Sequence, residues 1–95
     1  MITHGRARTA SADRYVQQLV KHWGHKFATS YANGRGEVPF SAETHATFDA
    51  REDGIAITLV TADGESAEQM KNVIAGHLDR FAFREGALAF DWSEA

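Results

Sequence analysis

The strongest constraint on the fold is the order in which the apolar residues change their spacing along the chain. They recur first at the three- and four-residue spacing of an amphipathic helix, then alternate as in strands, and then return to helical spacing. An extended segment over residues 3–10 precedes the first helical run, and another over residues 87–92 follows the second. The predicted order is therefore strand, helix, four strands, helix, strand.

Both helices carry recognisable start signals. Ser11 is a favoured N-cap residue, and Asp13 then lies in the first turn, where the helix dipole favours a negative charge. Gly24 is a stop signal for this helix. Ser66 and Gln69 form a capping box that predicts the start of the second helix. The two predicted apolar stripes contain Val16, Leu19, Val20, Trp23 and Phe27, and then Met70, Val73, Ile74, His77, Leu78 and Phe81.

The first predicted hairpin joins residues 27–31 to residues 37–40. Its turn is the pair Asn33-Gly34, a strong signal for a tight hairpin, which Gly36 is expected to widen. Pro39 places the short return strand at a sheet edge or a strand end, because proline cannot donate to a ladder.

The second predicted hairpin joins residues 44–51 to residues 55–61 through Asp53-Gly54. Both strands alternate between apolar and polar residues, which is typical of strands with one buried face. The residues expected on that face are Thr44, Ala46, Phe48, Ala50, Ile55, Ile57 and Leu59.

Both helical stripes are buried when the two helices pack on one face of a mostly antiparallel sheet. The expected fold class is therefore α+β, in two layers, with two helices packed on one face of the sheet. A chain of 95 residues suits a single domain over residues 1–95, which buries only roughly 60–65% of its unfolded surface. An open groove or an oligomer interface is therefore easier to accommodate than an enclosed catalytic cavity.

Composition excludes several classes of function. Without cysteine there are no disulfides, thiolate metal sites or cysteine nucleophiles. No apolar run approaches the ~20 residues needed to span a bilayer, and the first residues lack the apolar core of a signal peptide, so a cytoplasmic location is expected. Residues 1–47 contain six basic and three acidic residues, whereas residues 48–95 contain four basic and ten acidic residues. No basic stripe with interleaved aromatics is present, so no nucleic-acid partner is expected.

Three of the five histidines are candidate metal ligands: His22, His25 and His77. The first two flank Trp23 at the end of the first helix, and the third lies on the apolar stripe of the second. Because a mononuclear site needs three or four ligands, all three would have to meet. The alternatives are a core imidazole bonded to a carbonyl or carboxylate at His77, and two cationic groups at a helix C-terminus at His22 and His25.

The segment over residues 77–85 is dense in aromatic and charged side chains. Arg80 and Arg84 are four residues apart, so both could face one anion, or they could form ion pairs with Asp79 and Glu85. An enzymatic interpretation would make His77 a general base beside Arg80. It ranks last, because no nucleophile, cofactor motif or acid–base pair is visible, and no residue is assigned as catalytic.

Residues 21–27 (KHWGHKF) and 77–85 (HLDRFAFRE) resemble the two signature segments of a small bacterial family, domain of unknown function 2218. The resemblance extends over essentially the whole chain. It implies a setting close to iron uptake, because similar domains are fused to, or encoded beside, siderophore-interacting ferric reductases of the flavin type. The positions that it marks are His22, Trp23, His25, Lys26, His77, Arg80, Phe81, Arg84 and Glu85.

Two functions from different classes follow. The first is a binding module that holds iron, a ferric chelate or another small anionic ligand near the two helices. Iron is then the implied cofactor, and a site without any cofactor is equally compatible. The second is an interaction protein that forms a homodimer or docks on a siderophore-interacting reductase, with no ligand of its own. The ligand candidates, besides the three histidines, are Trp23, Lys26, Arg80, Arg84 and Glu85.

Overall fold

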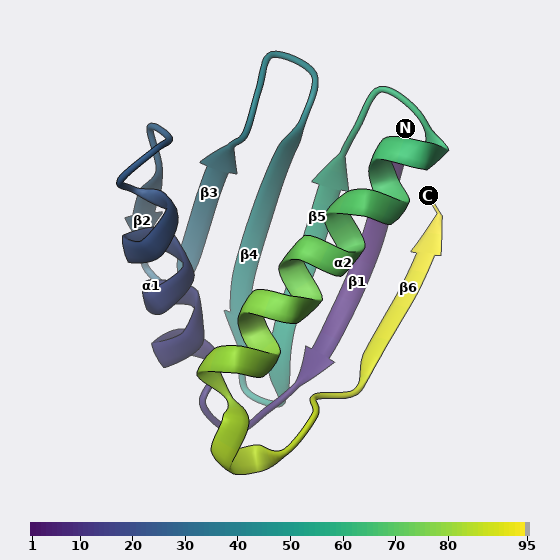
Figure 1. Cartoon of the computed structure of the whole chain (residues 1–95). Coiled ribbons are helices and arrows are strands. Elements are labelled where there is room, and N and C mark those ends of the chain that lie inside the picture. Colours follow the sequence, from purple (N-terminus) through teal and green to yellow (C-terminus); the bar gives the residue numbers. More distant parts are fainter. Residues whose placement is uncertain (95) are drawn as a thin grey trace.

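The computed structural model describes residues 1–94 and confirms the predicted α+β class and element order (Figure 1). A short 3-10 helix, η1, follows the second helix and is the one element that the sequence did not predict. None of the helices within the described residues is long and apolar enough to cross a membrane. The elements are β1 (Ile2–Arg8), α1 (Ala12–Trp23), β2 (Ser30–Ala32), β3 (Arg35–Pro39), β4 (His45–Arg51), β5 (Gly54–Val60), α2 (Gly64–Phe81), η1 (Phe83–Glu85) and β6 (Phe90–Glu94).

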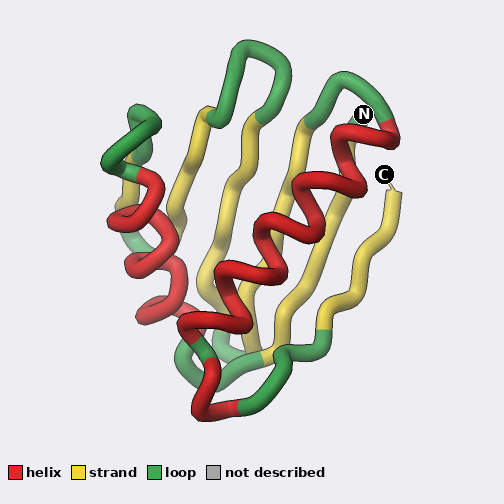
Figure 2. The backbone as a smooth tube through the Cα atoms, viewed as in Figure 1, coloured by secondary structure: helices red, strands yellow, loops and turns green. Residues whose placement is uncertain are grey.

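The six strands form one antiparallel sheet in the order β2-β3-β4-β5-β1-β6. The strands nearest the two ends of the chain, β1 and β6, therefore lie side by side, and Gly5 is paired with Trp92. Both helices cover the same face of the sheet, as predicted, and α2 crosses it diagonally (Figures 1 and 2). The end of α1 and the second half of α2 are thereby brought to the same side of the molecule.

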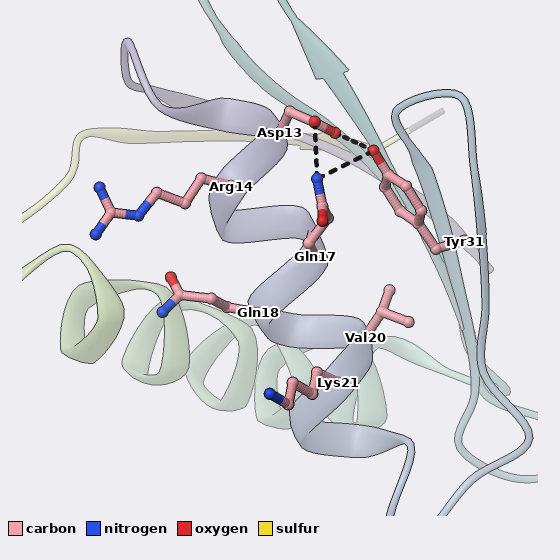
Figure 3. A pocket seen from close by; sticks show the side chains of 7 residues that line it. All are labelled: Asp13, Arg14, Gln17, Gln18, Val20, Lys21 and Tyr31. Carbon is pink, nitrogen blue, oxygen red and sulfur yellow. Dashed lines mark hydrogen bonds between the residues drawn. The ribbon is translucent and has the colours of Figure 1, made fainter.

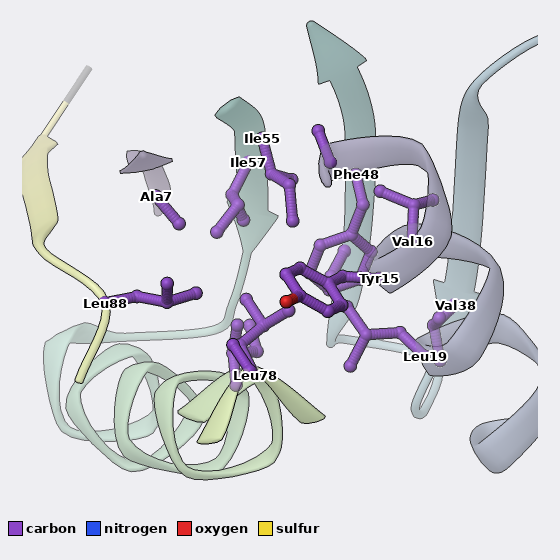
Figure 4. Close-up of a cluster of buried hydrophobic side chains, with 14 of the residues drawn as sticks. Ala7, Tyr15, Val16, Leu19, Val38, Phe48, Ile55, Ile57, Leu78 and Leu88 are labelled. Atoms are coloured by element: carbon purple, nitrogen blue, oxygen red, sulfur yellow. The ribbon is translucent and has the colours of Figure 1, made fainter. Parts of the chain in front are cut away.

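The core lies between the sheet and the two helices (Figure 4). The strand face predicted to be buried does face the helices, and Phe48, Ile57 and Leu59 have almost no exposed surface. Burying each such side chain contributes about 1.5–3 kcal/mol. The helices contribute the fully buried Leu19 and Leu78 from their predicted stripes.

Gly36 does not widen the first hairpin, as predicted from the sequence, but lies inside β3. The turn consists of Asn33 and Gly34 alone, with φ of 50° and 81°. At Gly36 helix α1 approaches the strand so closely that an added Cβ would lie 2.6 Å from Cγ2 of Val20. The glycine is therefore needed for helix–sheet packing rather than for the turn.

The capping box predicted at Ser66 and Gln69 is wrong. Helix α2 begins at Gly64, and the N-cap is Asp63, whose Oδ1 accepts the backbone N–H of Ser66 at 2.8 Å. Ser11 does precede α1, but its side chain makes no capping bond; its own N–H instead donates to Oγ1 of Thr9 at 3.1 Å.

Phe27 is not on helix α1, although its spacing predicted that it would extend the apolar stripe. The helix ends at Trp23, and a turn follows in which the N–H of Phe27 donates to the Trp23 carbonyl at 2.9 Å. The extended run predicted from residue 27 begins only at Ser30. Phe27 still packs against the core, because the turn folds its ring back onto Phe40, with ring centroids 5.1 Å apart.

Candidate functional site

A groove of about 520 Å³ opens where the end of α1 faces α2, a volume within the range of small-molecule sites. The turn after α1 and Phe40, just after β3, supply the rest of its wall. We call it the aromatic groove. Its lining residues are His22, Trp23, His25, Lys26, Phe27, Phe40, Met70, Val73 and His77.

Trp23 anchors the groove in the core. It is 5% exposed, and its ring packs edge-on against Phe40 at 5.0 Å and stacks on Phe48 at 6.0 Å between centroids. Its ring also lies 4.9 Å from the imidazole of His77. The floor of the groove is thus a rigid aromatic surface that belongs to the hydrophobic core.

His22 and His77 meet across the interface of the two helices, with ring centroids 4.9 Å apart. The Nδ1 atom of His77 lies 2.7 Å from the carbonyl oxygen of Val73, one turn earlier in α2. The ring is half-buried rather than in the core, and it forms the backbone bond that was one of the alternatives for this residue. The sequence placed these histidines on two separate helices, and only the packing of the helices brings their rings together.

His22, His25 and His77 do not gather into a group of three metal-ligating side chains within the described residues. Residues 1–94 contain no group of three or more His, Cys, Asp or Glu side chains that could hold a metal ion. His25 lines the same groove and acts on His22 as a neighbouring positive charge. The arrangement therefore brings imidazoles together without the carboxylate that a mixed metal site would use.

The surroundings of His22 disfavour a proton on its ring. Loss of hydration against the neighbouring rings lowers the pKa of His22, and the positive charges of His77, Arg80 and His25 lower it further. The neutral form of the His22 imidazole is therefore favoured where the two helices meet.

Lys26 lines the groove, whereas Arg80 does not line it and acts on His22 as a nearby positive charge. Within residues 1–94 the ion pairs involve Arg6, Arg35, His45 and Lys71, and none involves these two side chains. The carboxylate of Asp79, an expected partner for Arg80, instead accepts the backbone N–H of Leu88 at 3.0 Å.

Arg84 and Glu85, also predicted as ligand candidates, do not line the groove. They lie in η1 beyond the end of α2, so Arg80 and Arg84 do not share a helix face. The guanidinium of Arg84 lies 5.6 Å from the ring centre of exposed Phe83.

The carboxylate of Glu85 ties η1 to the start of the chain. It accepts a short hydrogen bond from the hydroxyl of Tyr15 in α1 and bonds at 2.8 and 3.0 Å from the hydroxyl of Thr9. These bonds hold the pKa of Glu85 below its usual value, and the same bond, with burial, raises the pKa of Tyr15. Sequence reasoning missed this network, because Tyr15 and Thr9 lie 70 and 76 residues before Glu85 in the chain.

The replacement Glu85→Gln is expected to reduce stability near neutral pH, and the deficit should shrink in acid. A carboxyl whose pKa is lowered by folding stabilises the fold above its unfolded pKa, and that contribution is lost as the pH falls through the folded pKa. Urea unfolding of both proteins from pH 7 down to pH 3 measures the difference. Glu43→Gln, in an exposed loop, is the matched control, and an equal pH trend in both variants would contradict the network's role.

A second groove, of about 530 Å³, runs along the outer side of α1 beside Tyr31 (Figure 3). Asp13 accepts hydrogen bonds there from the hydroxyl of Tyr31 and, at 2.9 Å, from Gln17 Nε2. Arg14 and Lys21 also line this groove, across the helix from Tyr31 (Figure 3). The carboxylate of Asp13 is thus already bonded to side chains of the protein itself. The aromatic groove is therefore the stronger candidate for a ligand site.

Comparison with known proteins identifies the family of the chain, and the matching descriptions name no function. A family model described as "Uncharacterized protein conserved in bacteria (DUF2218)" matches residues 4–93. The chain is similar to a solved structure entitled "NMR structure of PA4090 from Pseudomonas aeruginosa", with 36% identity and a TM-score of 0.81. That match covers 97% of this chain and 94% of the other. No curated protein matches the chain.

Proposed function

The chain belongs to the bacterial family DUF2218, and from this premise we propose that it is a small binding domain whose aromatic groove holds a planar anionic ligand. One observation carries the proposal: the groove is lined by His22, His25, His77 and Lys26, and by no carboxylate. Four groups that are or can become cationic therefore face one cavity, with nothing on its walls to neutralise them.

The aromatic walls select the shape of the ligand. Phe27 and Phe40 pack edge-on with their ring centres 5.1 Å apart, and Phe40 packs in the same way on Trp23. Flat rings favour a planar partner through stacking and edge contacts, and each such contact is worth about 0.5–1.5 kcal/mol. An aromatic carboxylate combines both requirements, since its ring meets the walls and its charge meets Lys26 and the imidazoles.

A ferric chelate with net negative charge belongs to the same class. The resemblance to domains found beside siderophore-interacting reductases makes such a chelate the biological ligand that we favour. In this proposal the histidines contact the chelate as positive or hydrogen-bonding groups and do not bind the metal ion directly.

The simple anion 2-naphthoate, titrated into ¹⁵N-labelled protein, tests the proposal. We expect saturable amide shifts at the end of α1 and the facing part of α2. Replacing Lys26 with glutamine should weaken binding about three- to tenfold, as expected for the loss of one partly exposed ion pair. Lys21→Gln, in the last turn of α1 and outside the aromatic groove, should leave the affinity unchanged.

Two outcomes would contradict the proposal. The first is equal binding of 2-naphthylmethylammonium, which has the same rings and the opposite charge. The second is saturable binding of ferrous iron that the variant His22→Ala/His77→Ala loses, which would favour the histidine metal centre instead.

The second candidate function is docking on another protein or on a second copy of the chain. The observation that favours it is Phe83, which is 70% exposed and carries the guanidinium of Arg84 beside its ring. An exposed aromatic side chain with an arginine is typical of the residues that dominate protein interfaces. Absence of any naphthoate binding, together with a dimer in sedimentation that Phe83→Ser dissociates, would support this function over the first.

A further inference from the structure

The hydrogen bond between His77 and its own helix fixes which nitrogen of the ring carries the proton. A carbonyl oxygen only accepts hydrogen bonds, so Nδ1 of His77, 2.7 Å from the Val73 carbonyl, must be the donor. In the neutral imidazole the other nitrogen, Nε2, is then unprotonated and is an acceptor. It lies on the far side of the ring from the carbonyl that Nδ1 contacts.

This acceptor is free in the part of the chain that the structure describes. No hydrogen bond to Nε2 of His77 is formed within residues 1–94, and the ring is held in place by His22 and Trp23, each 4.9 Å away between ring centres. Both Val73 and His77 line the aromatic groove. Lys26, which reaches the groove from the turn after α1, offers only donors.

A ligand that fills the groove therefore meets two kinds of polar group. Its negative charge is matched by Lys26 and by protonated His22 or His25, while its contact with His77 must supply a hydrogen. A ligand without such a hydrogen would cover the acceptor and leave it without a partner, which costs binding free energy.

We propose that His77 is a specificity-determining residue, which selects anionic aromatic ligands that carry a hydroxyl group on the ring. This inference rests on the proposed function, and it narrows the ligand class to aromatic hydroxy acids. His77 acts here through its Nε2 acceptor and through the orientation that Val73 imposes on its ring.

The test compares three ligands that differ at one position: 2-naphthoate, 6-hydroxy-2-naphthoate and 6-methoxy-2-naphthoate. Binding of each ligand is followed by titration of ¹⁵N-labelled protein at one fixed pH, so that the three affinities can be compared directly. We expect the hydroxy acid to bind about five- to tenfold more tightly than the methoxy acid, as for one net hydrogen bond.

Two variants assign the preference to His77. His77→Phe keeps an aromatic ring against Trp23 and removes both nitrogens. His77→Asn keeps an amide that can donate to the Val73 carbonyl and lacks the distant acceptor. Both should bind the hydroxy and methoxy acids equally, whereas His25→Phe should weaken both ligands and keep their ratio.

The results separate this inference from the function on which it rests. If 2-naphthoate binds and the wild-type protein does not distinguish hydroxy from methoxy, the role of His77 is wrong and the groove remains an anion site. If both His77 variants keep the preference, another acceptor is responsible and the inference is overturned. If none of the three ligands binds, the proposed function fails and the inference fails with it.

Discussion

Replacement of Trp23 by alanine is expected to destabilise the protein by about 3–5 kcal/mol, the largest effect of any change considered for the groove. The side chain is 5% exposed and contacts Phe40, Phe48 and His77, so its removal leaves a large cavity between α1, the sheet and α2. Domains of this size are stable by only about 5–15 kcal/mol in total, so the variant should lose much of its margin. Urea unfolding followed by circular dichroism measures the loss.

Phe83→Ala is the matched control for Trp23, because it also shortens an aromatic side chain to alanine. Phe83 is 70% exposed, so the change in stability should stay within about 0.5 kcal/mol. Trp23→Phe keeps a ring in the core and should remain folded, which allows its 2-naphthoate affinity to be measured. A loss below about 1 kcal/mol for Trp23→Ala would show that the ring does not join the groove to the core.

Replacement of Gly54 by alanine is expected to cost roughly 2–4 kcal/mol. Gly54 begins β5 opposite Arg8, and its φ of +159° lies at the limit of what other residues adopt. A Cβ there would lie 2.2 Å from the carbonyl oxygen of Ala7, a backbone atom that cannot move without disturbing the β1–β5 ladder. The same unfolding measurement tests this value.

Gly76→Ala is the control for the glycine replacement and should have the opposite sign. Gly76 lies inside α2, and a Cβ there would meet nothing within 4 Å. Alanine is favoured over glycine in a helix by about 1 kcal/mol, so this variant should be more stable than the wild type. Equal changes at the two glycines would contradict the contact inferred at Gly54.

Local chemistry was enough to place every strand and both long helices in order. Asn33-Gly34 was predicted as a hairpin turn, and both residues adopt the positive φ that this turn requires. The boundaries were less well determined, because several residues offered the same signal. Asp63 and Ser66 are both good N-caps, and Asp63 takes that position after Thr61, whose hydroxyl donates to the Asp63 carbonyl at 3.0 Å.

The candidate site was predictable only in its parts. The concentration of aromatic and basic residues around Trp23 and around His77 was visible in the sequence, and the structure brings those two segments together. Glu85 belongs to the same predicted group, yet its carboxylate is held by Thr9 and Tyr15. The spacing of residues along the chain cannot distinguish a carboxylate that binds a ligand from one that forms hydrogen bonds to distant segments.

By itself the sequence determined what depends on neighbours along the chain: the helical and alternating periods, the turn residues, and the absence of thiol chemistry. Only the tertiary structure decided what depends on neighbours in space. It placed β1 beside β6 and set the rings of His22 and His77 4.9 Å apart. The physical reason is that periodicity fixes which face of an element is buried, while the partner that covers this face is selected by the packing of the whole chain.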